Sequence, residues 1–377
     1  MALPTSPPEV SAGATTTVAV PLRAVLETAV AHGASDVHIR AGAPPLIRVS
    51  GQLCPLELPA LSEADCARLV GEALTADADR LSLRDEHEAD FALTEPGVGR
   101  FRVNAYRTRG SDAMVLRHVK EQIPTIADLG LPAIVADLAH ASAGLILVCG
   151  PTGSGKTTTL AAMIDAINES RPCHILTIED PIEFLHTNKR ASVSQRELHT
   201  DTADFGRALR AAMRQDPDVI LVGEIRDVET MRTALQAAET GHLVLATLHA
   251  QTVVDAVNRI MDIVPMDEQR QARASLAESI QGIVCQHLVP SASGDGRTMV
   301  MEIATGTPRV KDAIADPAKT AMLSEIIAEG DYYGMRTFEQ DAIRLVLSGT
   351  IAVSAAEKVV PRVADLHVAL RRAGYRE

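Results

Sequence analysis

The stretch GPTGSGKTTTL, residues 150–160, decides the fold of this chain. Its first part, Gly150 to Thr157, matches G-x-x-x-x-G-K-[ST], the pattern of loops that hold nucleotide phosphates. An apolar run, GLILVCG (144–150), precedes the loop, and a helix-forming run, TTTLAAMIDAIN (157–168), follows it. A chance glycine turn would lack this strand and this helix. The sequence therefore predicts a nucleotide-binding loop within an α/β domain.

Each residue type in this loop has a physical role in holding phosphate. Gly153 and Gly155 have no Cβ atom, so the backbone can wrap around an anion with its N–H groups pointing inward. The N-terminal dipole of the following helix adds attraction. Lys156 is expected to reach the β and γ phosphates of ATP, and Thr157 to ligate Mg²⁺. The predicted cofactor-binding set is Gly150, Pro151, Thr152, Gly153, Ser154, Gly155, Lys156, Thr157 and Thr158.

Two further apolar strands end in carboxylates. The run DPDVILVGEIRD (216–227) ends near Glu224, with Gly223 where many phosphate-loop proteins have a magnesium-binding aspartate. A second run, TIEDPIEF (177–184), supplies Glu179, Asp180 and Glu183. Taken singly, each glutamate is as well explained as a solvated loop residue. Because the carboxyl ends of parallel strands meet at one edge of a sheet, we expect these acids to orient Mg²⁺ and the attacking water.

A third apolar strand, in GHLVLATLHA (241–250), lies between His242 and His249. A lone histidine is more often a core or surface residue than a catalytic one. His249 stands at the carboxyl end of the strand, where ligands bind in such sheets. We expect it to sense the γ-phosphate and to link its loss to movement.

Composition bounds the class of protein. The chain has 377 residues, of which 46% are hydrophobic, so two globular domains are expected. The net charge of −13 argues against nonspecific binding to nucleic acid, which depends on lysine and arginine. The five cysteines are scattered and form no C-x-x-C pair, which indicates reduced thiols, no structural zinc and a cytosolic location. The apolar runs are shorter than a membrane span, and residues 1–20 do not resemble a signal peptide.

The chain divides into segments of different pattern. Residues 1–20 are predicted to be a flexible tail, and residues 21–120 a small α+β domain. The proline-containing segment EQIPTIADLGLP (121–132) is a candidate linker. In residues 133–377, short apolar strands alternate with helices, with a polar loop after the second strand and mostly helix after about Gly330. This alternation favours a doubly wound, largely parallel sheet.

A series of motifs in fixed order covers nearly the whole chain. They are ASDVHIRAGAPPLIRVSG (34–51), GRFRVNAYRTRG (99–110), the phosphate loop, HILTIEDPIEF (174–184), QRELHTDTADFGRALRAAMRQDPDVILVGEIRDVET (195–230), ALQAAETGHLVLATLH (234–249) and GMRTFEQ (334–340). In this order they resemble the PilT-type retraction ATPases of type IV pili, within the type II/IV secretion ATPase superfamily. The resemblance implies a PAS-like N-terminal domain joined to a RecA-like P-loop ATPase domain with a helical C-terminal region.

The resemblance also assigns roles to matching residues. Glu183 becomes the base that polarises water, Glu224 the Walker B glutamate and His249 the His-box residue. Arg102 and Arg109 are expected to act on the phosphates of a neighbouring subunit, as arginines do in phosphoryl transfer. The implied metal ligands are Thr157, Glu179 and Glu224. Three further arginines, Arg196, Arg210 and Arg214, are weaker candidates because surface arginines are more often salt-bridge partners.

The implied function is that of a homohexameric, Mg²⁺-dependent ATPase that powers pilus retraction and twitching motility. It would act at the cytoplasmic face of the inner membrane, by peripheral association with a platform protein of the pilus machinery, with residues 121–132 as hinge. The absence of a tetracysteine motif favours the retraction branch over pilus extension and type II secretion ATPases. The segment TPRVKDAIADP (307–317) stands where retraction motors have an A-I-R-N-L-I-R-E element. Thr307 and Pro308 match such motors, but Arg309 to Asp316 diverge. An accessory pilus motor or a related secretion-system ATPase therefore stays open.

Two functions of other classes compete with this interpretation. A RecA-like nucleic-acid translocase would share the fold and the fuel, but the chain is acidic, has 2% aromatic residues and lacks tryptophan for base stacking. A nucleotide-regulated scaffold would bind ATP without hydrolysing it. The presence of Glu183, Glu224 and His249 argues against the scaffold.

Overall fold

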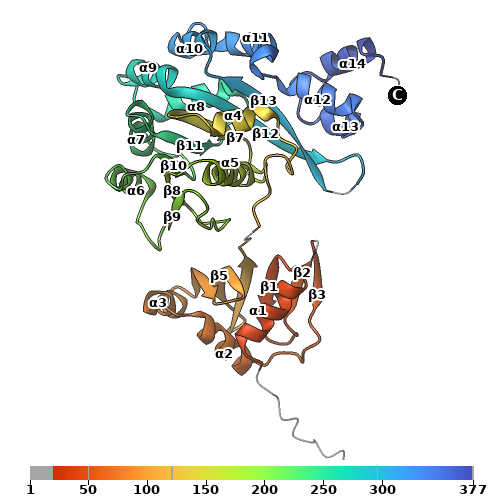
Figure 1. Ribbon diagram of the computed structural model, residues 1–377. Helices are drawn as coiled ribbons and strands as arrows, with labels where there is room; N and C mark the ends of the chain where they lie inside the picture. Colours follow the sequence, from red (N-terminus) through yellow and green to blue (C-terminus); the bar gives the residue numbers. More distant parts are fainter. Residues whose placement is uncertain (1–19, 50, 120–121, 295, 376–377) are drawn as a thin grey trace, which may run out of the picture. The chain divides into compact units, whose positions relative to one another are not determined.

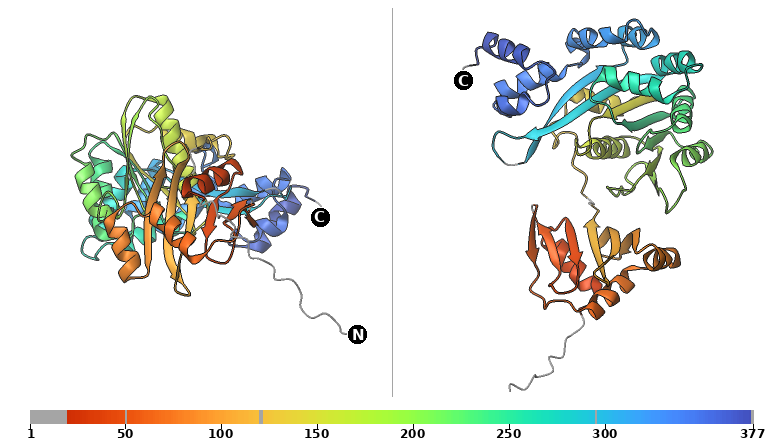
Figure 2. Two further views of the ribbon diagram at one scale, coloured as in Figure 1. Left: turned by 90° about the horizontal axis from the view of Figure 1, so that it is seen from below. Right: turned by 180° about the vertical axis from the view of Figure 1, so that it is seen from behind.

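The computed structural model describes residues 20–49, 51–119, 122–294 and 296–375. The chain divides into two compact units between Val119 and Lys120 (Figures 1 and 2). Each unit has its own apolar core. All but the last residue of the predicted tail, and the first residue of the predicted linker, Glu121, lie outside the described residues.

The N-terminal unit is a six-stranded antiparallel sheet of order β3-β2-β1-β6-β5-β4. Alternate side chains of these strands form a core with apolar residues of three helices, among them Leu26, Leu69 and Leu83. The strands are β1 (Asp36–Ile39), β2 (Leu46–Val49), β3 (Gln52–Pro55), β4 (Glu88–Glu95), β5 (Gly99–Thr108) and β6 (Ser111–His118), and the helices are α1 (Leu22–Ala31), α2 (Glu63–Ala73) and α3 (Asp77–Asp85).

The second unit is built on a seven-stranded sheet of order β13-β12-β7-β11-β10-β8-β9. Only β13 runs antiparallel to its neighbour, so the largely parallel sheet expected from the sequence is confirmed. The strands are β7 (Gly144–Cys149), β8 (His174–Glu179), β9 (Ser192–Glu197), β10 (Val219–Val222), β11 (Leu243–Leu248), β12 (Ile280–Pro290) and β13 (Arg297–Thr305).

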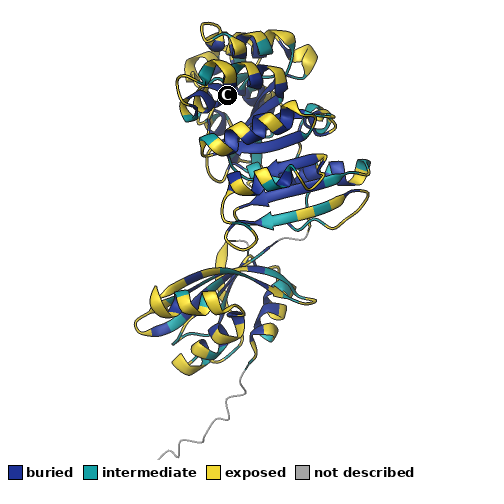
Figure 3. Cartoon of the chain, turned by 90° about the vertical axis from the view of Figure 1, so that its left-hand side faces the viewer, coloured by how far each residue is buried: buried dark blue, intermediate teal, exposed yellow. Residues whose placement is uncertain are grey.

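Helices cover both faces of this sheet, which explains why its central strands are apolar throughout. Every residue of β7, β10 and β11 is buried (Figure 3). One apolar layer includes α4 (Ala133–Ala139) and α5 (Lys156–Ser170); the other includes α6 (Phe205–Ala212), α7 (Val228–Glu239), α8 (Val253–Ile263) and α9 (Gln269–Ser279). Strands buried on both faces read as continuous hydrophobic runs.

The C-terminal region is helical, as predicted. Its elements are α10 (Pro308–Ala315), η1 (Thr320–Met322), α11 (Leu323–Ala328), η2 (Asp331–Tyr333), α12 (Phe338–Leu347), α13 (Val353–Ala356) and α14 (Val363–Arg372). No helix in the described part of the chain is both long enough and apolar enough to span a membrane.

The prediction of a polar loop after the second strand of this domain missed a strand. The segment contains β9, which pairs in parallel with β8 at the edge of the sheet. Its sequence, SVSQRE, has little apolar content because an edge strand is stabilised mainly by backbone pairing and faces solvent. The long hairpin of β12 and β13 was not expected either, and it lies beside the phosphate loop.

Candidate active site

The phosphate loop joins β7 to α5 and depends on its glycines. Gly150, Gly153 and Gly155 have φ angles of 146°, 78° and 90°, which residues with a side chain rarely adopt. A Cβ atom at Gly150 would also collide with the carbonyl oxygen of Gln286 and the Oγ atom of Ser154. The loop therefore holds its shape only with glycine at these positions.

Lys156 is held inside the loop by the loop's own backbone. Its Nζ atom donates hydrogen bonds to the carbonyl oxygens of Gly150, at 2.8 Å, and Pro151, at 3.0 Å. Burial lowers the pKa of Lys156, while nearby acidic groups, Glu224 foremost, act to raise it. A phosphate next to this ammonium group would compensate the charge that burial disfavours.

A cavity of about 480 Å³ opens beside the loop and brings most of the predicted residues together. From the loop, Thr152, Gly153, Gly155, Lys156, Thr157 and Thr158 line it; from the strand ends come Glu179, Asp180, Glu183, Glu224 and His249. Three predicted loop residues, Gly150, Pro151 and Ser154, are not among the described residues that line the cavity. The side chain of Ser154 is buried, and Gly150 and Pro151 supply the carbonyl groups that bind Lys156.

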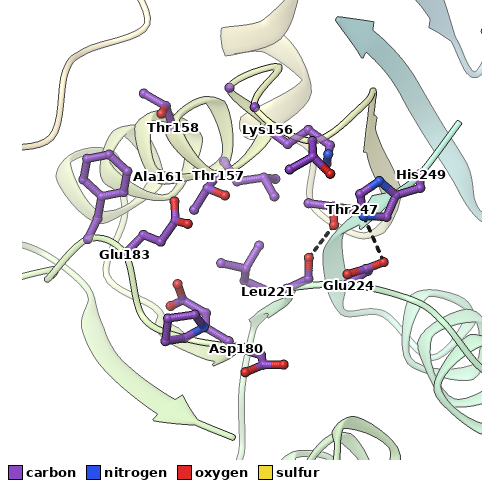
Figure 4. Close-up of a pocket in the computed structure, with 18 of the residues that line it drawn as sticks. Lys156, Thr157, Thr158, Ala161, Asp180, Glu183, Leu221, Glu224, Thr247 and His249 are labelled. Atoms are coloured by element: carbon purple, nitrogen blue, oxygen red, sulfur yellow. Dashed lines mark hydrogen bonds and ion pairs between the residues drawn. The ribbon is translucent and has the colours of Figure 1, made fainter. Parts of the chain in front are cut away.

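Glu224 lies between two cationic or hydrogen-bonding groups at the end of β10. Its Oε1 atom is 3.2 Å from Nε2 of His249 (Figure 4). Its Oε2 atom is 2.6 Å from Nη2 of Arg226. The adjacent strand is tied to the same turn, because Oγ1 of Thr247 donates to the carbonyl oxygen of Gly223. Glu224 is 16% exposed, so its carboxylate is fixed yet still faces the cavity.

The absence of an aspartate at position 223 has a steric cause. A Cβ atom on Gly223 would stand 3.1 Å from the carbonyl oxygen of Ile178 and 3.3 Å from Cα of Glu179. Strand β8 thus leaves almost no room for a side chain there. The strand-end carboxylate of β10 is therefore carried one residue later, by Glu224.

The two acids of the β8 end differ in environment. Glu179 is buried, and its Oε1 atom accepts hydrogen bonds from Thr177, at 2.7 Å, and Gln195, at 3.1 Å. Burial raises the pKa of Glu179 to about 7. Glu183 is exposed and reaches toward the first turn of α5, where Thr157 lies (Figure 4). The exposed acid is the one that faces the part of the cavity where phosphates would lie.

The predicted metal-binding residues suit a hard cation. Thr157, Glu179 and Glu224 line one cavity and offer only oxygen atoms, the donors that Mg²⁺ prefers. No group of three or more His, Cys, Asp or Glu residues within the described segments could hold a metal alone.

The predicted arginines lie elsewhere. Arg102 is exposed on β5 and pairs across the sheet with Arg117, whose Nε atom is 2.8 Å from Asp36. Arg109 is exposed at the β5–β6 turn, with a φ angle of 53°. Both belong to the N-terminal unit, whereas every described residue that lines the cavity belongs to the second.

The weaker arginine candidates make local contacts. Arg196 donates to the carbonyl oxygen of Asp201 at 3.1 Å, Arg214 donates to that of Arg210, and Arg210 pairs with Glu229. None of the three is among the described residues that line the cavity. His242 lies at the opposite end of β11 from His249, with Nδ1 3.0 Å from the carbonyl oxygen of Ala237.

The sequence analysis did not identify Gln286, which forms hydrogen bonds with the phosphate loop and with the first turn of α5. This side chain of β12 is fully buried, donates to the carbonyl oxygen of Ser154 at 2.8 Å and accepts from Oγ1 of Thr159 at 3.0 Å. Nothing near Gln286 in the sequence marks it, because its role depends on β12 lying beside β7. Arg226 was also missed, although its place two residues after Glu224 is a usable signal.

A phosphate loop on a largely parallel sheet, faced by acidic strand ends and a histidine, defines a P-loop nucleoside-triphosphate hydrolase. The family model described as type II/IV secretion system protein matches residues 12–321. The chain belongs to this family, and it is an ATPase of the family.

Individual relatives agree with this assignment. The chain is 43% identical over 320 residues to the type IV pilus retraction ATPase PilT of Pseudomonas aeruginosa, covering 85% of this chain and 92% of the relative. It is 38% identical over 347 residues to the type IV pilus ATPase PilU of the same species, covering 92% and 90%. A crystal structure of the pilus retraction motor PilT with bound ADP superimposes with a TM-score of 0.86 at 41% identity, covering 93% of this chain and 99% of that one. The resemblance proposed from the motifs, including nucleotide binding, is thereby confirmed.

Proposed function

We propose that the protein is a ring-forming ATP-driven motor that powers retraction of a type IV pilus, and with it twitching motility. The main support is its 43% identity to a pilus retraction ATPase over 85% of the chain. The arrangement of Glu224, His249 and Arg226 around the cavity supports a chain that hydrolyses nucleotide rather than only binding it. Such a motor converts the loss of a phosphate into a change of shape.

In this proposal the phosphate loop holds the α and β phosphates through its backbone N–H groups, and Lys156 turns from its carbonyl partners to the β and γ phosphates. Thr157 and Glu224, with Glu179 beside them, would hold Mg²⁺, which would supply positive charge that stabilises the phosphates during hydrolysis. Glu183 orients and polarises the attacking water. His249 detects the γ-phosphate through its contact with Glu224.

The ring is proposed to contain six copies, with ATP between neighbours. Arg102 and Arg109 of one copy then stabilise the transition state in the next, a contribution of about 10³- to 10⁵-fold when an arginine is supplied in this way. We assign residues 21–120 to a PAS-like domain, residues 133–377 to a RecA-like domain, and the hinge to residues 121–132. Ile126, Leu129 and Leu131 pack on the core of the second unit.

We place the motor at the cytoplasmic face of the inner membrane, where it acts on a platform protein of the pilus machinery. The second candidate is an accessory motor that assists another ATPase. Its support is the 38% identity to PilU over 92% of the chain, together with the divergent segment Arg309 to Asp316.

A complementation experiment separates these functions. The gene is introduced into two twitching bacteria, one lacking its retraction ATPase and one lacking only its accessory motor. Restored twitching in the first strain, lost with Lys156→Ala, is the result expected of a retraction motor. Restoration only in the second strain identifies an accessory motor. Restoration in neither strain, with ATPase activity intact, contradicts both and favours a secretion-system role.

A further inference from the structure

One face of the β12–β13 hairpin forms a wall beside the phosphate loop. Along this face the register pairs Gln286 with Met301, Leu288 with Met299, and Pro290 with Arg297. The first pair is at the loop itself, because Gln286 binds Ser154. The second pair abuts Gly155: a Cβ atom there would stand 3.4 Å from Met299 and 3.5 Å from Leu288. The third pair, Pro290 and Arg297, lies on the same face of the hairpin, farther along the strands from Gln286.

Arg297 is directed toward the cavity by strand geometry. Side chains alternate between the two faces of a strand, so Arg297 lies on the same face as Met299, two residues later. Met299 faces α5, with its sulfur 3.8 Å from Oγ1 of Thr159. Arg297 and Leu288 both line the cavity.

Arg297 differs from the other cations of the cavity in having no partner among the described residues. Lys156 binds two carbonyl oxygens of the loop, and Arg226 binds Glu224. The side chain of Arg297 makes no hydrogen bond or ion pair with any residue of the described segments, and it is exposed. A guanidinium group at a cavity wall without a protein partner is suited to a ligand.

The sheet order places Arg297 at the nucleoside end of the nucleotide. Strand β7, which leads into the loop, lies between β11 and β12. The acids and His249 follow β8, β10 and β11, all on one side, whereas the hairpin lies on the other. In a phosphate loop the lysine reaches the β and γ phosphates and the backbone holds the α and β phosphates. With the γ-phosphate toward Glu224 and His249, the α-phosphate and the nucleoside extend toward Thr158, Leu288 and Arg297.

We propose that Arg297 is a nucleotide-binding residue that holds the nucleoside end of bound ATP or ADP. Its planar guanidinium group stacks on the adenine ring, with Leu288 as the apolar surface beside it. Guanidinium groups stack on aromatic faces because they are planar and weakly hydrated. The contact binds ground state and transition state alike, so it changes KM and leaves kcat unchanged.

The test compares the binding of ADP with that of pyrophosphate, which lacks the nucleoside. Titration calorimetry with Mg²⁺ present is applied to the full chain, to Arg297→Ala and Arg297→Lys, and to Arg362→Ala as a matched control on an exposed arginine of the C-terminal region. We expect Arg297→Ala to weaken ADP binding about tenfold, as the loss of a partly desolvated cation–π contact does. Pyrophosphate binding should change less than twofold, and Arg297→Lys should be intermediate.

Three results would overturn the proposal. An equal loss for ADP and pyrophosphate would mean that Arg297 acts on the phosphate loop rather than on the nucleoside. Unchanged ADP binding would mean that it makes no contact. A similar loss in Arg362→Ala would show a general effect of removing charge. An unchanged melting temperature shows that each variant is folded.

Discussion

The imidazole Nε2 atom of His249 lies 3.2 Å from the Oε1 atom of Glu224, so the ends of β11 and β10 are joined where both side chains line the cavity. The other carboxylate oxygen of Glu224 is taken by Arg226, at 2.6 Å. In the proposed mechanism, Glu224 exchanges at least one of these partners when a nucleotide with its cation enters. We propose that this exchange couples the content of the cavity to the positions of two strands.

Removal of His249 should slow hydrolysis without abolishing binding. We expect His249→Ala to lower kcat by about 100-fold, as the loss of one preorganised donor at the reacting phosphate does. ADP affinity should stay within about threefold, because the phosphate loop is intact. His242→Ala is the matched control, since this residue lies at the other end of β11. Equal losses in both variants would contradict a special role for His249.

The arginines should act across subunits. Arg102→Ala and Glu224→Gln, each alone, are expected to lose at least about 100-fold in turnover. When the two variants are mixed so that rings contain both chains, some sites combine an intact Glu224 with an intact Arg102 from the neighbour. Phosphate release should then rise well above that of either variant. Additive, near-zero activity in mixed rings would mean that Arg102 does not act on the site of a neighbouring copy.

The contact of Gln286 with the loop should affect both stability and nucleotide affinity. Gln286→Leu removes the donor to Ser154 and the acceptor of Thr159 in a fully buried place. We expect the free energy of unfolding to fall by about 1–3 kcal/mol, since buried polar groups lose their partners. The KM for ATP should rise while kcat changes little. Urea unfolding and steady-state kinetics measure the two effects, with exposed Gln236→Leu as control. An unchanged KM would limit Gln286 to a structural role.

Glu302 should make stability depend on pH. This buried residue of β13 accepts a hydrogen bond from the backbone N–H of Val253, and burial, with Asp255 nearby, raises its pKa from 4.5 to about 7. The native state therefore holds the proton more tightly than the unfolded chain, and its contribution to stability falls as pH rises through this window.

Glu302→Gln keeps an acceptor for Val253 and removes the titration. We expect this variant to match the parent chain at pH 4.5 and to be more stable than the parent at pH 8, as measured by urea unfolding. The exposed Glu239→Gln serves as control. The same stability difference at both pH values would show that the carboxyl group of Glu302 titrates alike in both states.

Much of the fold followed from the sequence because its strands are buried on both faces. The runs GLILVC and LVLATL read as strands since every residue in them is apolar or small and is covered by helices. Strand β9 could not be recognised, because its SVSQRE sequence lies at the sheet edge and is defined by backbone pairing with β8. The β12–β13 hairpin was missed as well.

The sequence predicted those residues of the candidate site that follow the carboxyl ends of the strands. Glu183, Glu224 and His249 were found because the carboxyl edge of a parallel sheet collects them, and they do line one cavity. Gln286 and Arg297 were not found, because their role depends on which strand lies beside β7. The reason for glycine at position 223 could not be predicted from the sequence either, because it depends on how closely β8 approaches that position.

The rate of phosphate release by the purified chain, compared with Glu224→Gln, tests the account most directly when the oligomer is sized by light scattering in the same ATP solution. The account predicts hexamers whose turnover falls at least about 100-fold in the variant while ADP still binds. A chain that stays monomeric in ATP and releases no phosphate, or a Glu224→Gln variant with undiminished turnover, would contradict it.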